Sequence, residues 1–442
     1  MSLPSYAERV LEQVRRAGAE GDLIVDESES LGLKARDGEL EEQSVSATRM
    51  LGLRVIRDER VGIAYSEAGD EAALDQLVEQ ALLNAGFNQH EPHERIPDHQ
   101  QTLTTDDAML CPDSGLDIEQ RIELALYLER TLAGLPKIRN VPYNGVSEHL
   151  GSRRVFSTRG LQASSRQRVN MLYAYALAAE GELTAMAGHG QVVRNGADLK
   201  ADPVIEQAHR QAVAMLHGKP VPSRRYDVIF DVEAQHDLFG AFATMLSGKS
   251  AQDGINPWRE RIGEVVASSD FHLSDHPHHL GGFGYQLFDA EGTATRETPL
   301  VVGGVLQTLL HNTATASHLG THTTGHAQRS PRSALGVAAH QLVIAAGRAT
   351  QGELTSGEYL ELTDLQGVHS GANAISGDFS FGVSGYLCRE GTRIAPVRGV
   401  TVAGNFYQML KQIAAIGDTQ HWNWQRTALM PTLRFAELAI SG

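Results

Sequence analysis

Ala372-Asn-Ala-Ile-Ser-Gly-Asp-Phe-Ser-Phe-Gly-Val-Ser-Gly385 is the stretch of this 442-residue chain that decides its fold. Glycines at positions 377, 382 and 385 stand among small polar residues, so the stretch serves backbone geometry rather than side-chain bulk. Glycine within a strand pattern indicates a turn, a bulge or the close approach of another backbone. One interpretation is turns and bulges inside a sheet. The other is a groove edge on which an unfolded polypeptide adds as a strand, with Gly377 and Gly382 lining the groove.

Further segments on both sides of this stretch complete a pattern that is similar to one known family. They are Asp289–Thr295, Val302–Gln307, Leu319–Ala327, Tyr386–Gly391, Val400–Asn405 and Ile416–Asp418. The pattern resembles the C-terminal half of the TldD/PmbA proteins, which are known as modulators of DNA gyrase and understood as a metalloprotease system. Lys34–Gly38 and Leu51–Tyr65 resemble the family's N-terminal signature more loosely.

The catalytic members of this family, TldD, hold zinc with a His-Glu-x-x-x-His helix and a downstream cysteine. The corresponding segment here, Val228–Phe242, contains one histidine, His236, and no His-Glu pair. Trp424–Pro431 stands where the catalytic relatives place the cysteine, and it has none. The resemblance is therefore to the PmbA branch, also called TldE. It implies a subunit that is not catalytic alone, binds no cofactor of its own and pairs with a zinc-containing TldD-like subunit.

The resemblance also implies partners. A TldD-like catalytic subunit, a homodimer when the chain is alone, and an unfolded polypeptide or peptide substrate are expected. The dimer is expected to form through the C-terminal half of the chain.

Three histidines at intervals of four, His318, His322 and His326, offer an alternative metal site. On a helix or a strand this spacing places all three on one side, but no acidic residue lies among them to act as a base. An independent metallopeptidase using this cluster is one alternative function, and a non-enzymatic binding regulator is another. The simpler interpretation makes Gly325 and His326 polar contacts that line a peptide groove.

Composition limits the class of partner and the cellular compartment. The formal net charge of -16 opposes binding to nucleic acid phosphates, and no basic run interleaved with aromatic residues is present. Cys111 and Cys388 form neither a disulfide framework nor a Cys-x-x-Cys pair. The N-terminus lacks the pattern of a signal peptide, and no run of 18 apolar residues occurs. These features predict a cytoplasmic protein that binds neither nucleic acid nor membrane.

Hydrophobic periodicity predicts an α+β fold with helices packed on antiparallel or mixed sheets. We expect an N-terminal α+β domain over residues 1–110, a central domain over 111–222, and a glycine-rich, β-dominated domain over 223–442. Apolar residues at helical spacing predict helices over 7–17, 73–82, 118–132 and 201–216, and alternation predicts a meander of strands over 23–65. An apolar strand over 226–232 should lead into a helix that begins near Glu233.

Overall fold

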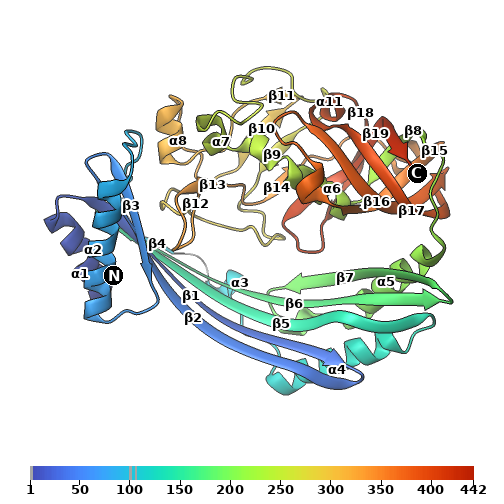
Figure 1. The fold of residues 1–442 in the computed structure, drawn as a ribbon, viewed down its shortest axis with the longest axis horizontal. Helices are drawn as coiled ribbons and strands as arrows, with labels where there is room; N and C mark the ends of the chain where they lie inside the picture. The colour runs from blue at the N-terminus through green and yellow to red at the C-terminus, as the bar shows by residue number, and fades with distance from the viewer. Residues whose placement is uncertain (1–2, 99–101, 105–106) are drawn as a thin grey trace.

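The computed structural model describes residues 3–98, 102–104 and 107–442, which form helices packed on two large sheets (Figure 1). The predicted α+β class is confirmed. No helix in these described ranges is both long and apolar enough to cross a membrane.

The first sheet is long and curved, and it contains strands from both sides of residue 110. In chain order these are β1 (Glu20–Arg36), β2 (Glu39–Arg57), β3 (Arg60–Ser66), β4 (Thr102–Thr104), β5 (Ile138–Ser157), β6 (Gln162–Glu180) and β7 (Leu183–Val193). The strand order is β3-β2-β1-β5-β6-β4, and β7 pairs with the other end of β6. All these pairs are antiparallel except β4 with β6. Because β1 pairs with β5, the predicted boundary at residue 110 does not separate two sheets, and the division into two domains there stays a prediction.

Two groups of helices cover one face of this sheet, one group at each end. α1 (Ser5–Arg16) and α2 (Glu71–Phe87) pack at one end, and α4 (Ile118–Ala133) and α5 (Ala201–Ala214) at the other (Figure 1). The predicted helical stripes are the buried ones: Val10, Leu11 and Val14 of α1 are fully buried. A capping box between Asp117 and Gln120 begins α4, because each side chain bonds the other residue's backbone N–H.

The second sheet builds residues 223–442 and mixes parallel with antiparallel pairs. Its strands are β8 (Arg224–Phe230), β9 (Leu273–Asp275), β10 (Thr298–Val302), β11 (Val305–Leu306), β14 (Leu342–Ile344), β15 (Glu358–Gln366), β16 (Asp378–Arg389), β17 (Thr392–Asn405), β18 (Ile413–Trp422) and β19 (Ala428–Ser441). The order is β11-β10-β9-β14-β19-β17-β16-β15-β8, with β18 against β19 and β8 also against β19. β12 (Ala327–Gln328) and β13 (Gly336–Val337) form a separate pair.

Short helices connect these strands, and α6 (Val232–Ala241) is the one that follows β8 as predicted. The others are α7 (Gly248–Gln252), α8 (Thr313–His318), α9 (Gln351–Leu354), α10 (Val368–Gly371) and α11 (Phe406–Lys411), whereas the short helix α3 (Asp107–Leu110) follows β4 of the first sheet.

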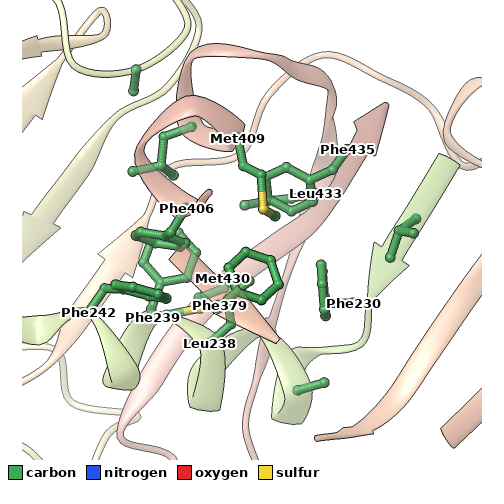
Figure 2. Close-up of a cluster of buried hydrophobic side chains, with 14 of the residues drawn as sticks. Phe230, Leu238, Phe239, Phe242, Phe379, Phe406, Met409, Met430, Leu433 and Phe435 are labelled. Carbon is green, nitrogen blue, oxygen red and sulfur yellow. The ribbon is translucent and has the colours of Figure 1, made fainter. Parts of the chain in front are cut away.

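An aromatic core fixes α6 against the second sheet (Figure 2). Phe242, just after α6, stacks on Phe406 with ring centroids 4.4 Å apart, and Phe239 meets the same ring edge-on at 5.2 Å. Full burial of each such side chain contributes about 2–3 kcal/mol. The position of α6 is therefore set by packing as well as by its chain neighbours.

A buried ionic network joins the two sheets. Arg54 on β2 donates from Nε and Nη2 to Asp22 at 2.8 and 2.6 Å, and from Nη1 to Glu94 at 2.9 Å. Its Nη2 also lies 3.4 Å from Glu291, and Arg329 donates to the other oxygen of Asp22. Because Glu291 and Arg329 belong to the second unit, the N-terminal strands and residues 223–442 are held together by paired, desolvated charges.

Candidate functional site around α6

The first turn of α6 is shaped by a buried acidic N-cap. Asp231 ends β8, and its carboxylate accepts the backbone N–H of Ala234 at 2.9 Å. Burial raises the pKa of Asp231 to about 7, against the opposing effect of this hydrogen bond. The cap explains why the helix begins at Val232, directly after an apolar strand.

The C-terminal segment lies directly on this turn of α6. Oε1 of Glu233 accepts the backbone N–H of Trp424 at 2.7 Å, and Nε2 of Gln235 donates to the carbonyl of Pro431 at 3.2 Å. The two segments that carry the zinc ligands in the catalytic relatives thus meet in space in this chain.

The residues present at this meeting point do not fit a zinc ion. His236 is the one imidazole on α6, and its Nδ1 lies 3.6 Å from Asp237. Glu233 is engaged with the Trp424 backbone, and burial raises the pKa of its carboxyl. Among the described residues, no group of three possible ligands includes any residue of α6. No step of a metal-dependent reaction can therefore be assigned to this site.

A cavity of ≈ 750 Å³ opens beside the start of α6, lined by residues of β8, β15, β18 and β19 among others. Two of its charged groups are paired with each other: Arg393 donates to both oxygens of Glu361, at 2.7 and 2.9 Å. Asp231 and His421 also line the cavity. Cys388 lies nearby, fully buried, and burial raises the pKa of its thiol to about 11. A protonated, buried thiol is a poor nucleophile and a poor metal ligand. Asp231 is engaged as the N-cap of α6, and no reaction is assigned to this cavity.

The structure does not bring His318, His322 and His326 together as one site. His318 and His322 are exposed, whereas His326 is fully buried. His318 packs edge-on against His93 with ring centroids 4.9 Å apart. The three do not form a ligand group among the described residues, because α8 ends at His318 and the chain then runs as a loop. The alternative metallopeptidase based on this cluster therefore lacks its geometry.

His326 belongs instead to a hydrogen-bonded cluster centred on Asp275, at the end of β9. Oδ2 of Asp275 lies 2.8 Å from Nε2 of His326 and 3.1 Å from Nδ1 of His340. Oδ1 accepts the backbone N–H groups of His340 and Gln341 at 2.8 and 2.7 Å. Asp275 thus accepts four hydrogen bonds, and Nδ1 of His326 meets Thr324 at 2.8 Å.

The Asp275 cluster is the one group of three possible metal ligands in the described parts of the chain. Its hydrogen bonds account for both carboxylate oxygens and for both nitrogens of His326 without an ion. Burial disfavours the charge on Asp275, but the bonds from His326 and His340 outweigh burial, and the pKa of Asp275 lies below its usual range. Burial lowers the pKa of His326, so both groups favour a neutral imidazole beside a carboxylate.

No sequence motif indicated this cluster. Asp275, His326 and His340 lie 51 and 14 positions apart and share no motif. The pairing of β9 with β14 brings Asp275 beside His340, and the pairing of β12 with β13, continued by the bond from the Ala338 N–H to the His326 carbonyl, brings His326 to them.

The predicted groove glycines occupy different environments. Gly325 has φ +78° and Gly377 has φ +85°, and a Cβ on Gly377 would lie 2.5 Å from the Tyr407 ring. Gly382 lies inside β16, opposite Gln366 of β15 and Thr401 of β17. β16 has a partner strand on each side, so it offers no free edge. The prediction that an unfolded polypeptide adds as a strand at Gly382 is therefore wrong. A role of these glycines in lining a groove stays a prediction.

Models of one protein family match three segments that together make up most of the chain. Residues 21–85 match PmbA/TldA metallopeptidase domain 1, residues 111–216 match the PmbA/TldA metallopeptidase central domain, and residues 223–442 match the PmbA/TldA metallopeptidase C-terminal domain.

Individual relatives agree with these matches. The chain is 26% identical over 419 residues to a metalloprotease PmbA homolog of Haemophilus influenzae, covering 92% of this chain and 89% of the relative. It is 25% identical over 403 residues to metalloprotease PmbA of Escherichia coli O157:H7, covering 90% and 87%.

Solved structures share the fold. A proposed modulator of a DNA gyrase from Thermotoga maritima superposes with a TM-score of 0.88 at 23% identity, covering 99% of each chain. TldE from Thermococcus kodakarensis superposes with a TM-score of 0.85 at 20% identity, covering 99% of this chain and 100% of that one.

Proposed function

Because the chain belongs to the PmbA/TldA metallopeptidase family, we propose that it is a PmbA/TldE-like subunit of a TldD–TldE-type zinc protease complex. In this proposal the chain holds no catalytic zinc, and a TldD-like partner supplies the metal. The complex hydrolyses peptides or unfolded polypeptides in the cytoplasm.

One observation carries the proposal. α6 and Trp424–Pro431 meet through the Glu233 and Gln235 hydrogen bonds, but the contact contains a single imidazole, His236, and no thiol. A zinc protease site needs three ligands and an open position for water. The two segments that would carry the zinc ligands therefore still meet, but the ligands themselves are absent. We expect this of a subunit that helps to enclose the substrate without cleaving it.

The partners follow from the same proposal. We place the contact with the TldD-like subunit on the C-terminal half of the chain, and the chain alone forms a homodimer through that half.

The test compares the chain alone with the reconstituted complex. Tag-free chain should contain no stoichiometric zinc by elemental analysis and should not hydrolyse casein, whereas addition of a TldD-like subunit should give hydrolysis that a chelator abolishes. His236→Ala should leave hydrolysis by the complex unchanged, because His236 has no metal to bind. Replacing a zinc-binding histidine of the catalytic subunit is the matched control and should abolish hydrolysis.

Two results would overturn the proposal. One is chelator-sensitive hydrolysis by this chain alone, which would assign catalysis to it. The other is a monomeric mass at micromolar concentration together with no association with the supplied catalytic subunit.

A further inference from the structure

The face of the first sheet that α4 and α5 do not cover carries exposed aromatic side chains. Tyr143 of β5 and Tyr175 of β6 are cross-strand neighbours, and their rings meet edge-on with centroids 6.4 Å apart. Tyr143 is 57% exposed and Tyr175 is 38% exposed. Alternate residues of β6, such as Ala174 and Ala176, are buried under α4 and α5, so the tyrosines point away from those helices.

Glycines give these rings room to lie against the sheet. A Cβ on Gly188 of β7 would lie 2.4 Å from the Tyr175 ring, and a Cβ on Gly190 would lie 2.7 Å from the Trp424 ring. Gly145 of β5 has the same relation to Tyr173 of β6, at 2.7 Å. The alternation Gly188-His-Gly190 places both β7 glycines on one face.

We call Tyr143, Tyr173, Tyr175 and Trp424 the aromatic face. Trp424 is the residue whose backbone N–H binds Glu233 of α6, so the aromatic face lies next to the start of that helix. Figure 1 shows β6 and β7 passing beneath the unit that contains α6 and β16. The aromatic face is thus shared between the two units rather than buried within either.

Three carboxylates lie near the aromatic face, of which Glu233 accepts the backbone N–H of Trp424 at 2.7 Å and Asp364 accepts the side-chain amide of Gln366 at 2.9 Å. Burial, followed by the negative charge of Asp364, raises the pKa of the Tyr175 phenol. The charges of Glu233 and Asp237 act in the same direction, so all three carboxylates lie within electrostatic reach of this ring. In the described structure, no lysine or arginine forms an ion pair with any of the three, although His236 lies 3.6 Å from Asp237. Negative charge beside aromatic rings attracts cations and repels phosphate.

An edge strand borders the aromatic face. In the described part of the sheet, β7 pairs with β6 alone, so its outer side has no partner strand. An unpaired strand edge can bind an extended polypeptide through main-chain hydrogen bonds, with little dependence on sequence. β7 therefore offers the free edge that β16 lacks.

We propose that the aromatic face and its carboxylates bind an extended, unfolded polypeptide segment that contains lysine or arginine. The aromatic rings contact the aliphatic stems and charged ends of these side chains, and Asp237 and Asp364 neutralise their charge. This inference deepens the proposed function and rests on it, because it assigns the substrate class that the subunit presents to its catalytic partner.

The test measures peptide binding to the chain alone by fluorescence anisotropy. The probe is a short fluorescein-labelled peptide of alternating lysine and serine, and the control probe replaces each lysine by glutamate. The lysine peptide should bind with an affinity that falls as salt rises, and the glutamate peptide should not bind. Equal binding of the two peptides would overturn the proposal.

Variants locate the site. The double change Tyr143→Ser and Tyr175→Ser should raise Kd for the lysine peptide about tenfold, whereas Tyr143→Phe with Tyr175→Phe should keep the affinity because the rings remain. Asp237→Asn with Asp364→Asn should raise Kd about fivefold and reduce its salt dependence. Tyr127→Ser is the matched control, because Tyr127 is 47% exposed on α4, which packs on the opposite face.

The outcomes separate this inference from the proposed function. If the serine variant melts like the wild type and binds the lysine peptide equally well, the aromatic face is not the binding site. The proposed function would still stand if the complex hydrolysed casein. Conversely, lysine-peptide binding that depends on the tyrosines would support the aromatic face even if no catalytic subunit associated.

Discussion

Asp275→Ala is expected to destabilise the C-terminal unit, residues 223–442, by about 3–5 kcal/mol. The carboxylate is fully buried and accepts four hydrogen bonds, two from backbone N–H groups and two from imidazoles. Alanine leaves the N–H groups of His340 and Gln341 unpaired, at about 1–3 kcal/mol each. The bonds to His326 and His340 are charge-assisted and add to this loss.

Asp275→Asn is the matched variant, with an expected loss of about 1–2 kcal/mol. Its amide oxygen still accepts the two backbone N–H groups. Its amide nitrogen can donate to both imidazoles once they change tautomer, and the Thr324 hydroxyl oxygen can accept the hydrogen bond that the newly protonated Nδ1 of His326 donates. The asparagine variant therefore separates loss of charge from loss of hydrogen bonds.

Urea unfolding followed by tryptophan fluorescence is the assay. Trp258, Trp422 and Trp424 are the three tryptophans of the chain and all lie in residues 223–442, so their emission reports the unit that contains Asp275. The midpoint should fall strongly for the alanine variant and slightly for the asparagine variant.

A chelator distinguishes the hydrogen-bonded cluster from a metal site. We expect a chelator to leave the wild-type unfolding midpoint unchanged. The reasoning fails if the free energy of unfolding of Asp275→Ala lies within about 1 kcal/mol of the wild-type value, since a loss that small is typical of a surface substitution. It also fails if the chelator destabilises the wild type as much as Asp275→Ala does.

Three further results are expected. Burial lowers the pKa of His311 to about 4 and also lowers the pKa of His326, so the folded state favours neutral imidazoles at both positions. The stability that results is present above pH 6.5 and, for His311, falls by about 3 kcal/mol as the pH drops to 4. Melting temperatures measured across this pH range should show the fall, and His311→Gln should lessen it. Gly377→Val should lower the melting temperature markedly, because the φ of Gly377 is +85° and a Cβ there would clash with the Tyr407 ring. Gly382→Val should melt within a few degrees of the wild type, because the nearest atom to its added Cβ is the Gln366 Cβ at 3.5 Å. Equal melting temperatures of the two variants would contradict this expectation. Arg54→Met should cost about 3–5 kcal/mol and increase proteolysis between the two sheets, since it leaves buried carboxylates unpaired; wild-type resistance to a protease would contradict the role of the network.

Sequence patterns predicted those helices and strands whose determining residues lie close together in the chain. The apolar stripe of α1, the meander of strands over 23–65 and the change from strand to helix after β8 were predicted from the sequence, because hydrophobic periodicity acts within a few residues. The missing His-Glu pair and the missing cysteine were equally readable, because an absent side chain cannot be restored by folding.

The sequence by itself therefore determined the fold class, the family and the absence of the family's zinc ligands from α6 and Trp424–Pro431. Only the tertiary structure decided that His326 meets Asp275 rather than His318, that Gly382 is paired on both sides, and that Tyr175 meets Tyr143 on the sheet face away from α4 and α5. The physical reason is sequence separation. Strand pairing between segments far apart in the chain chooses each side chain's neighbours, and neither composition nor spacing encodes that choice.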